Sequence, residues 1–259
     1  MKIGQITNKN YLISKYVLVF LILMIWVIGS YFSLWNSYII PTPEKIISTT
    51  IKLIKNGALM KHLFISLSRI FTGFFITVII AIPSAVIFGM FPKIYNYFKG
   101  ILEFARHTPP LALIPMIILW FGIGETSKIV IIVLASFFPV FLNTLKGIES
   151  CDKKFIEVGK TFNFTKFEIF KKIIFPSAIP DILTGIKLGI GYSWRAIIGA
   201  EMIAASSGLG YLILDGQQMS RSDIIVVGIL SIGIFGSFTD WLCSKIIGKY
   251  IEKRGVFHE

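Results

Sequence analysis

The sequence predicts an all-α integral membrane protein with about six transmembrane helices, in a single domain that covers residues 1–259. Of its residues 54% are hydrophobic and only 15% are charged, and the mean hydropathy is +0.76. Soluble domains carry more charge, and their apolar runs are shorter. Crossing a bilayer takes roughly 20 mainly apolar residues. Runs of this kind lie at about 14–35, 66–91, 101–121, 127–146, 178–205 and 223–247.

The first run follows Lys2, Lys9 and Lys15, a pattern that also begins a secretory signal. Its apolar part, residues 16–34, is too long for a signal core, and no cleavage site with small residues follows it. We therefore expect the first run to be a retained membrane span.

The basic residues of the loops predict the orientation of the spans. With six spans the two termini share one side, which holds 16 lysines and arginines against 7 on the other side. Because cytoplasmic loops are enriched in Lys and Arg, both termini are predicted to face the cytoplasm. Cys151 and Cys243 fall on that same reducing side, so we expect free thiols. The outer loop, residues 36–65, is basic too, and we expect it to contain an amphipathic helix that lies on the outer surface and is capped by Thr42.

A polar, basic segment at residues 152–176 separates the fourth span from the fifth. Asp152 is a suitable cap for a first short helix over residues 153–162. Asn163 follows, and asparagine is the side chain that best tolerates the left-handed conformation in which helices often end. We therefore predict a helix that closes in a tight turn at Asn163.

A second short helix is predicted after this turn. Thr165 and Glu168 have the spacing of a capping box, which places the start of the helix at Thr165. We expect it to run to about residue 174 and to end at Pro176, because proline disrupts a helix interior. The segment then forms a hairpin of two helices.

This hairpin resembles the cytoplasmic coupling motif of bacterial ABC-importer permeases, which reads E-A-A, three residues, G, nine residues, I-x-L-P. Glu157, Val158 and Gly159 stand at E-A-A, and Asn163 stands at the glycine. The closing positions are occupied by Ile173, Phe175 and Pro176, and the nine-residue spacing is kept. Two further stretches, at residues 106–125 and 200–213, are similar to the subgroup that imports nitrate, sulfonates and taurine. His107 and Thr108 replace the Pro-Ile that is usual in that subgroup.

The resemblance implies a type I ABC-importer (MetI-like) transmembrane domain that pairs with a second permease subunit, usually an identical one. It also implies ABC ATPase subunits at the hairpin and an extracytoplasmic solute-binding protein at the other face. The ATPases would bind ATP and Mg, and this chain would bind no cofactor and would not be an enzyme. The residues expected to couple the chain to the ATPase are Glu157, Val158, Gly159, Phe162, Asn163, Phe164 and Pro176. The small residues among them would let a partner approach closely, and the aromatic ones would anchor it. An amphipathic hairpin that rests on lipid headgroups is the plainer alternative.

Four ionisable residues lie in or near the spans. A charge at mid-membrane costs about 2.5–3.5 kcal/mol on insertion scales, so each needs a partner or an aqueous cavity. Arg195 and Glu201 are candidates for the translocation path; the alternative is that they form structural ion pairs or snorkel to an interface. Lys187 and Arg106 are expected near the cytoplasmic ends of their spans, from which they would snorkel to the membrane surface.

Prolines and glycines mark positions of special geometry in the spans. The prolines are expected to interrupt helices, and either a lined path or plain kinking for packing would explain them. They are Pro83, Pro109, Pro110, Pro115 and Pro139. Gly185 and Gly189 form a small-xxx-small pair, for which a subunit interface and packing inside one subunit remain alternatives.

Other classes of function have little support in the sequence. The net charge of +12 is not arranged as a nucleic-acid-binding stripe, and the three histidines are dispersed, which argues against a metal site. We also find no arrangement of a nucleophile with a base. The alternatives to an importer permease are a secondary carrier driven by an ion gradient and a subunit that only anchors an ATPase. The sequence leaves the solute open; a small anion is favoured, and an uncharged solute remains an alternative.

Overall fold

Helices account for all the regular structure in residues 8–253, the part of the chain that the computed structural model describes; side chains are described for residues 17–250. Four helices are long and apolar enough to cross a membrane, and a bent pair makes a fifth candidate. The four are α3 (Ala58–Met90), α6 (Glu125–Glu149), the continuous helix Lys166–Ala204 and α11 (Ser222–Lys253). The prediction of an all-α integral membrane fold is confirmed.

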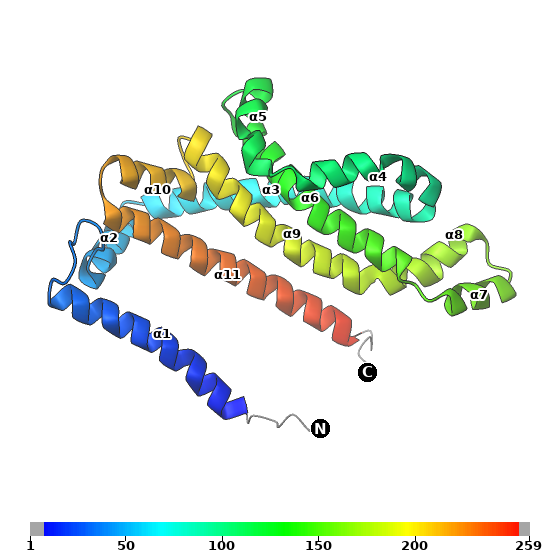
Figure 1. Ribbon diagram of the computed structural model, residues 1–259, viewed down its shortest axis with the longest axis horizontal. Helices are drawn as coiled ribbons and strands as arrows, with labels where there is room; N and C mark the ends of the chain where they lie inside the picture. Colours follow the sequence, from blue (N-terminus) through cyan, green and yellow to red (C-terminus); the bar gives the residue numbers. More distant parts are fainter. Residues whose placement is uncertain (1–7, 254–259) are drawn as a thin grey trace.

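The long helices run along the long axis of the molecule (Figure 1). One end carries α7 (Lys153–Thr161) and α8 (Lys166–Ile169), and we call it the hairpin end. The opposite end carries α2 (Pro43–Lys55) and α10 (Leu209–Gln218). These short elements therefore cap the two ends of one helical bundle.

Helix α1 (Asn8–Tyr31) corresponds to the first predicted span. Its described apolar part, Val17–Tyr31, is shorter than a full span, and most of its side chains are exposed. Helix α1 lies to one side of the bundle in Figure 1, and the Trp26 indole donates a hydrogen bond to the Pro41 carbonyl at 3.2 Å. The basic residues predicted at the two ends of the chain, from Lys2 to Lys15 and at Lys253 and Arg254, lie outside the described side chains.

The core of the bundle is the packing of α6 between α3 and α9 (Phe175–Ala204). Phe141 and Ile132 of α6 are fully buried there. A Cβ atom at Gly185 would lie 3.1 Å from the Pro139 carbonyl oxygen and 3.2 Å from the Val140 Cα, so α9 approaches the backbone of α6 closely. Gly185 is thus used for packing within the chain, one of the two alternatives that the sequence left open.

The predicted third span, residues 101–121, is not one helix, and this part of the prediction was wrong. Helix α4 (Pro92–His107) and the pair formed by η1 (Pro110–Leu113) and α5 (Ile114–Phe121) meet at an angle of 85°. The residues between them are extended, with ψ 118° at Thr108 and 123° at Pro109. Because a residue that precedes proline is disfavoured in the helical region, two consecutive prolines break the chain here.

The other prolines do not interrupt their helices, contrary to the expectation. Pro83 lies inside α3 and Pro139 lies inside α6, and both helices stay continuous. Pro115 lies in the first turn of α5, where the missing N–H has no helical partner to lose. A single proline in a long span is tolerated when neighbouring helices support the bend, whereas the tandem pair is not.

Pro176 does not end the second hairpin helix, which corrects a further expectation. A π-helical turn, η2 (Phe170–Ile174), joins α8 to α9, and the Phe175 N–H bonds to the Phe170 carbonyl. The hydrogen bonds change here from i+4 to i+5 spacing, so the helix passes Pro176 without the N–H that proline lacks. The second hairpin helix is therefore continuous with a membrane span.

Helix α2 begins at Thr42, whose hydroxyl accepts a hydrogen bond from the Lys45 N–H, so the predicted cap is confirmed. The helix is amphipathic, but it packs on protein as well as facing outward, because Ile46 and Thr49 are buried. The Thr49 hydroxyl donates to the Asp223 carboxylate at 2.6 Å, at the start of α11. Arg221 pairs with the same carboxylate at 2.7 Å, and this hydrogen bond raises the pKa of its guanidinium.

Replacing Gly185 with alanine is expected to lower the thermal unfolding midpoint of the purified protein in detergent. The new methyl group would press on the α6 backbone, and overpacking of this kind costs about 1–3 kcal/mol. Gly191→Ala is the matched control on the same helix, because a Cβ there meets no atom within 4 Å. The control should be neutral or stabilising by up to about 1 kcal/mol. Equal midpoints for the two variants would contradict the close contact between α6 and α9.

Candidate functional site

The first helix of the hairpin has the predicted ends. The Asp152 carboxylate accepts a hydrogen bond from the Lys154 N–H at 2.9 Å, which starts α7. Asn163 has φ 57°, the left-handed conformation that the sequence predicted, and the Phe164 N–H donates to the Gly159 carbonyl at 3.0 Å. The cap and the turn are confirmed, and together they fix the length of α7 and the direction of the chain after it.

The second helix starts with the predicted capping box. The Glu168 N–H donates to the Thr165 hydroxyl, and the Glu168 carboxylate accepts from the Thr165 N–H at 3.0 Å. The Lys172 ammonium bonds to Glu168 at 3.0 Å and lies 4.2 Å from the centre of the Phe164 ring. These local contacts hold α8 against the turn.

Gly159 lies between α7 and the second hairpin helix and also lines a groove beside them, and its role in coupling stays a prediction. Gly159 is buried, and a Cβ atom there would lie 2.6 Å from Cδ1 of Ile173. The nearest atom is the flexible end of the Ile173 side chain, so glycine allows the two hairpin helices to pack closely here, but no backbone contact requires it. Glu157 is exposed on α7, and Pro176 is partly buried at the base of the hairpin.

An apolar stripe covers the exposed face of α7. Phe155, Val158 and Phe162 are 61%, 51% and 69% exposed. Their spacing of three and four residues places them on one face of the helix. With Phe164 and Ile173 they line a groove of about 520 Å³. Phe155 was not among the predicted coupling residues, although the helical spacing to Val158 and Phe162 could have revealed it.

A buried charge cluster joins three helices near the opposite end of the bundle. Arg69 of α3 is 4% exposed and forms two hydrogen bonds of 2.6 Å with the Glu125 carboxylate, at the first residue of α6. It also bonds to Glu201 of α9 at 2.8 Å, and Glu201 has no exposed surface. The sequence placed Arg69 among the basic residues of the outer side and did not pair it.

The remaining contacts of the cluster fix the loop that follows α9. The Glu201 carboxylate accepts hydrogen bonds from the Ser66 hydroxyl at 2.8 Å and from the Gly210 N–H at 2.9 Å. Arg69 donates to the Ser207 carbonyl at 2.7 Å. Gly208 has φ 118°, and a side chain there would collide with the Glu201 carboxylate. The arrangement around Glu201 is that of a buried ion pair, and a role for Glu201 on a path stays a prediction.

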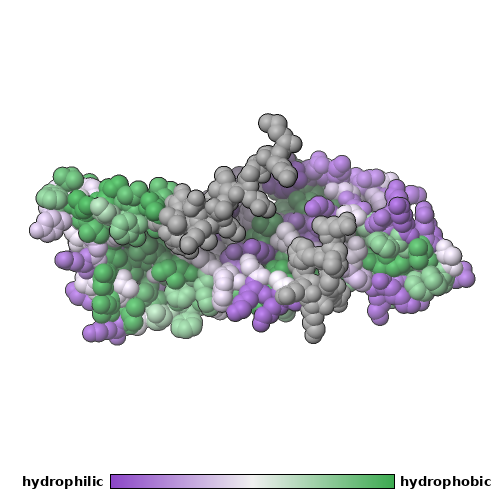
Figure 2. All heavy atoms as spheres, turned by 90° about the horizontal axis from the view of Figure 1, so that it is seen from below, coloured by the Kyte–Doolittle hydropathy of each residue, from purple (hydrophilic) through white to green (hydrophobic). Residues whose placement is uncertain are grey.

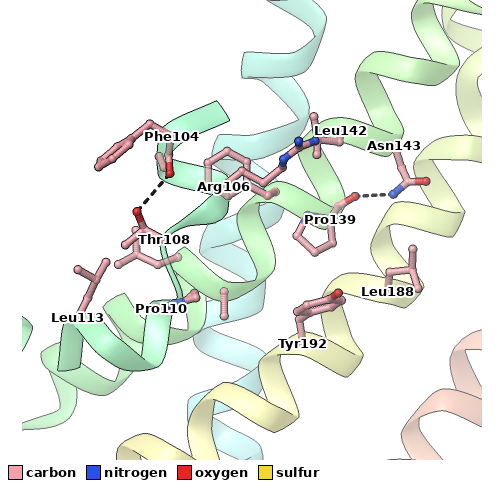
Figure 3. Close-up of a pocket in the computed structure, with 14 residues that line it drawn as sticks. Phe104, Arg106, Thr108, Pro110, Leu113, Pro139, Leu142, Asn143, Leu188 and Tyr192 are labelled. Carbon is pink, nitrogen blue, oxygen red and sulfur yellow. Dashed lines mark hydrogen bonds between the residues drawn. The ribbon is translucent and has the colours of Figure 1, made fainter. Parts of the chain in front are cut away.

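A cavity of about 590 Å³ opens at the break between α4 and η1, against α6 and α9 (Figure 3). Its walls are mostly apolar, with a few polar side chains. The residues that line the cavity include Arg106, Thr108, Leu134, Phe138, Asn143, Leu188 and Tyr192. Leu134 and Phe138 lie in the middle third of α6, and Leu188 and Tyr192 lie near the middle of α9. The cavity therefore lies about halfway along two membrane spans.

Arg106 is exposed and lines this cavity, and it lies in the last turn of α4, not near the cytoplasmic start of a span as the sequence predicted. Helix α4 begins at Pro92 next to the end of α3 and turns back along it, as the contacts of Tyr95 and Phe98 with Phe88 show. Arg106 then stands at the far end of α4. In Figure 3 its side chain extends toward Asn143 on α6.

Arg195 is exposed and lies beside the cavity. Its guanidinium carbon is 5.4 Å from the centre of the Tyr192 ring, and Tyr192 is one of the lining residues. Neither Arg195 nor Arg106 has a carboxylate within ion-pair distance among the described side chains, whereas Lys187 lies 3.7 Å from Asp240. Two unpaired guanidinium groups thus lie at or next to one cavity in the bundle.

Comparisons with known proteins identify the family to which this chain belongs. Residues 73–254 match the family of binding-protein-dependent transport system inner membrane components, and the chain belongs to this family. A Bacillus subtilis relative named as an aliphatic sulfonates transport permease protein, SsuC, is 36% identical over 91% of this chain and 86% of its own length. The taurine transport system permease protein TauC of Escherichia coli is 32% identical over 82% of this chain and 79% of its own. The protein is therefore an ABC transporter permease of the nitrate, sulfonate and taurine subgroup.

A solved structure supports the fold. The inward-facing MetNI methionine ABC transporter contains a chain that superposes with a TM-score of 0.67, over 75% of this chain and 97% of its own, at 15% identity. The predicted MetI-like membrane fold is confirmed.

Arg69→Met is expected to destabilise the protein by about 3–5 kcal/mol, because it leaves the buried Glu201 carboxylate without its counter-ion. Glu125→Gln should cost only about 0–1 kcal/mol, since Glu125 is 62% exposed and water can replace part of its pairing. Thermal unfolding of both variants in the same detergent measures the difference. Equal destabilisation would show that the buried pair contributes no more than the exposed one.

Proposed function

We propose that this chain is the permease subunit of an ATP-driven importer and forms the path of a small solute through the cell membrane. Membership of the permease family supports the transport role. The exposed apolar stripe on α7 is the observation that carries the coupling role, because an apolar patch on an otherwise polar hairpin is typical of a docking surface. The names of the relatives favour a small anion of the nitrate, sulfonate or taurine type as the solute.

The partners follow from this role. Two copies of the chain would surround the path, and each would contact lipid on its outer surface. An ABC ATPase subunit would dock on each hairpin and would bind ATP and Mg, so that this chain needs no cofactor and catalyses no reaction. A solute-binding protein would deliver the solute at the opposite end of the bundle. The two termini would then face the cytoplasm together with the hairpin, and residues 1–259 would form one membrane domain.

The hairpin connects the surface of α7 directly to a membrane span, so it can transmit movement. Gly159 of α7 packs against Ile169 and Ile173 of the second hairpin helix, and this helix continues through the π turn into α9. A displacement of α7 by a docked ATPase would therefore move a membrane span as a rigid lever. The span leads to Tyr192 at the cavity and to Glu201 in the buried charge cluster. Switching between two states also requires contacts that differ between them, which ATP-driven closure of the ATPases would supply.

A carboxylate in the apolar stripe should weaken coupling to the ATPase. Val158→Asp is expected to weaken ATPase binding by about tenfold or more, because a central apolar contact is replaced by a charge that must be buried. The measurement is co-purification of the ATPase from membranes, together with ATP turnover in lipid. Lys160→Asp, on the opposite face of α7, is the matched control and should retain the ATPase.

Two results would contradict the proposal in different ways. If Val158→Asp retains full coupling, the stripe is not the docking surface. If no ATPase co-purifies even with the wild type, and uptake continues on an ion gradient, the chain is a secondary carrier.

A further inference from the structure

We infer that the cavity at the α4 break is the site that holds the solute during passage, and that it selects a monoanion with an apolar tail, of the alkanesulfonate class. This inference rests on the proposed function and adds to it the substrate class and the residues that recognise it. It depends on the charge of one side chain, on the character of the walls and on the depth of the site.

Arg106 would contact the anionic group of the solute. It is the only charged side chain among the residues that line the cavity, and its nearest polar side-chain contact in the described part of the chain is the His107 ring at 3.4 Å. The Arg106 side chain is exposed in the single chain and has no carboxylate within ion-pair distance among the described side chains, so an anionic ligand in the cavity would supply the counter-ion that a charge within a membrane bundle needs. Guanidinium presents a planar pair of N–H donors that matches the oxygens of a sulfonate or carboxylate.

Two other polar side chains at the site already donate hydrogen bonds to backbone carbonyls, and Tyr192 and Arg195 can support the contact that Arg106 makes. The Asn143 amide donates to the Pro139 carbonyl at 2.8 Å, and the Thr108 hydroxyl donates to the Phe104 carbonyl at 3.1 Å. The Tyr192 hydroxyl forms no hydrogen bond to any described residue and lies in the cavity wall, so it is available as a second donor. Arg195 stacks near the Tyr192 ring and adds positive potential at the rim.

The walls accommodate an aliphatic tail. Leu113, Leu134, Phe138, Leu142 and Leu188 surround the space next to Arg106. A volume of about 590 Å³ lies within the range of small-molecule sites, and ligand pockets typically combine apolar walls with few polar groups. Nitrate has no apolar part that could contact these walls. Taurine carries an ammonium group, and no carboxylate lines the cavity. The chemistry of the site therefore favours an alkanesulfonate over both.

The test is direct binding to the importer complex in lipid nanodiscs, without the solute-binding protein, so that only the permease site is observed. Radiolabelled hexanesulfonate is the probe, and the competitors are sulfonates from one to eight carbons, taurine and nitrate. We expect affinity to rise about fourfold for each added methylene group until the cavity is full. Taurine and nitrate should compete weakly.

Two variants link this binding to the cavity. Arg106→Gln should weaken binding of every sulfonate by about tenfold or more, because a charge-assisted contact is lost. Lys99→Gln removes a charge from an exposed position of the same helix, outside the cavity, and should leave binding unchanged. Ala105→Leu, which projects into the cavity from α4, should weaken octanesulfonate binding more than ethanesulfonate binding.

The results separate this inference from the proposed function. Absence of saturable binding, an affinity independent of chain length, or an Arg106→Gln variant that binds like the wild type would overturn the cavity assignment. ATP turnover of the same complexes is measured in parallel. If turnover persists in these cases, the importer function stands and only the solute site is wrong; loss of ATPase association in the wild type would instead contradict the importer itself.

Discussion

Burial of the Arg69 guanidinium inside a membrane bundle is the constraint that determines the structure at the end of the molecule opposite the hairpin. An ion of this size is strongly destabilised in an apolar medium unless its donors are satisfied. Two carboxylates and a backbone carbonyl meet that need, and they come from α6, α9 and the loop before α10. The same contacts set where α9 ends and how α10 turns back. On the face shown in Figure 2, hydrophobic residues predominate toward the left, and hydrophilic residues gather toward the hairpin end on the right.

The second structural determinant is the break after α4. Tandem prolines at 109 and 110 prevent a straight third span, and the chain turns by 85°. Because α4 runs back beside α3, the break comes to lie against the middle of α6 and α9. One local backbone effect thus creates the cavity and also carries Arg106 into it. A straight helix over residues 101–121 would fill this space with its own side chains.

In the hairpin, interactions between residues close in the chain determine most of the structure. The Asp152 cap, the left-handed Asn163 and the Thr165–Glu168 capping box are interactions between residues close in the chain, and each was predictable from the spacing. Packing across the hairpin was not predictable in this way. Gly159 packs against Ile173 of the second helix, a contact that its small size alone did not indicate.

The sequence by itself determined the membrane class, the positions of most long helices, the caps of the hairpin and, through its motifs, the permease family. These properties depend on hydropathy, on proline and capping chemistry and on spacing, all of which are local. The tertiary structure alone decided that Arg69 pairs with Glu201, that Gly185 packs on α6, and that Arg106 reaches a cavity at the middle of the spans. Arg69 and Glu201 are 132 residues apart in the chain, and Gly185 and Pro139 are 46 apart, so periodicity gives no information about which faces meet. The direction in which α4 leaves α3 is set by packing, and this direction determines whether Arg106 lies near the hairpin end of α3 or at the cavity beside α6 and α9.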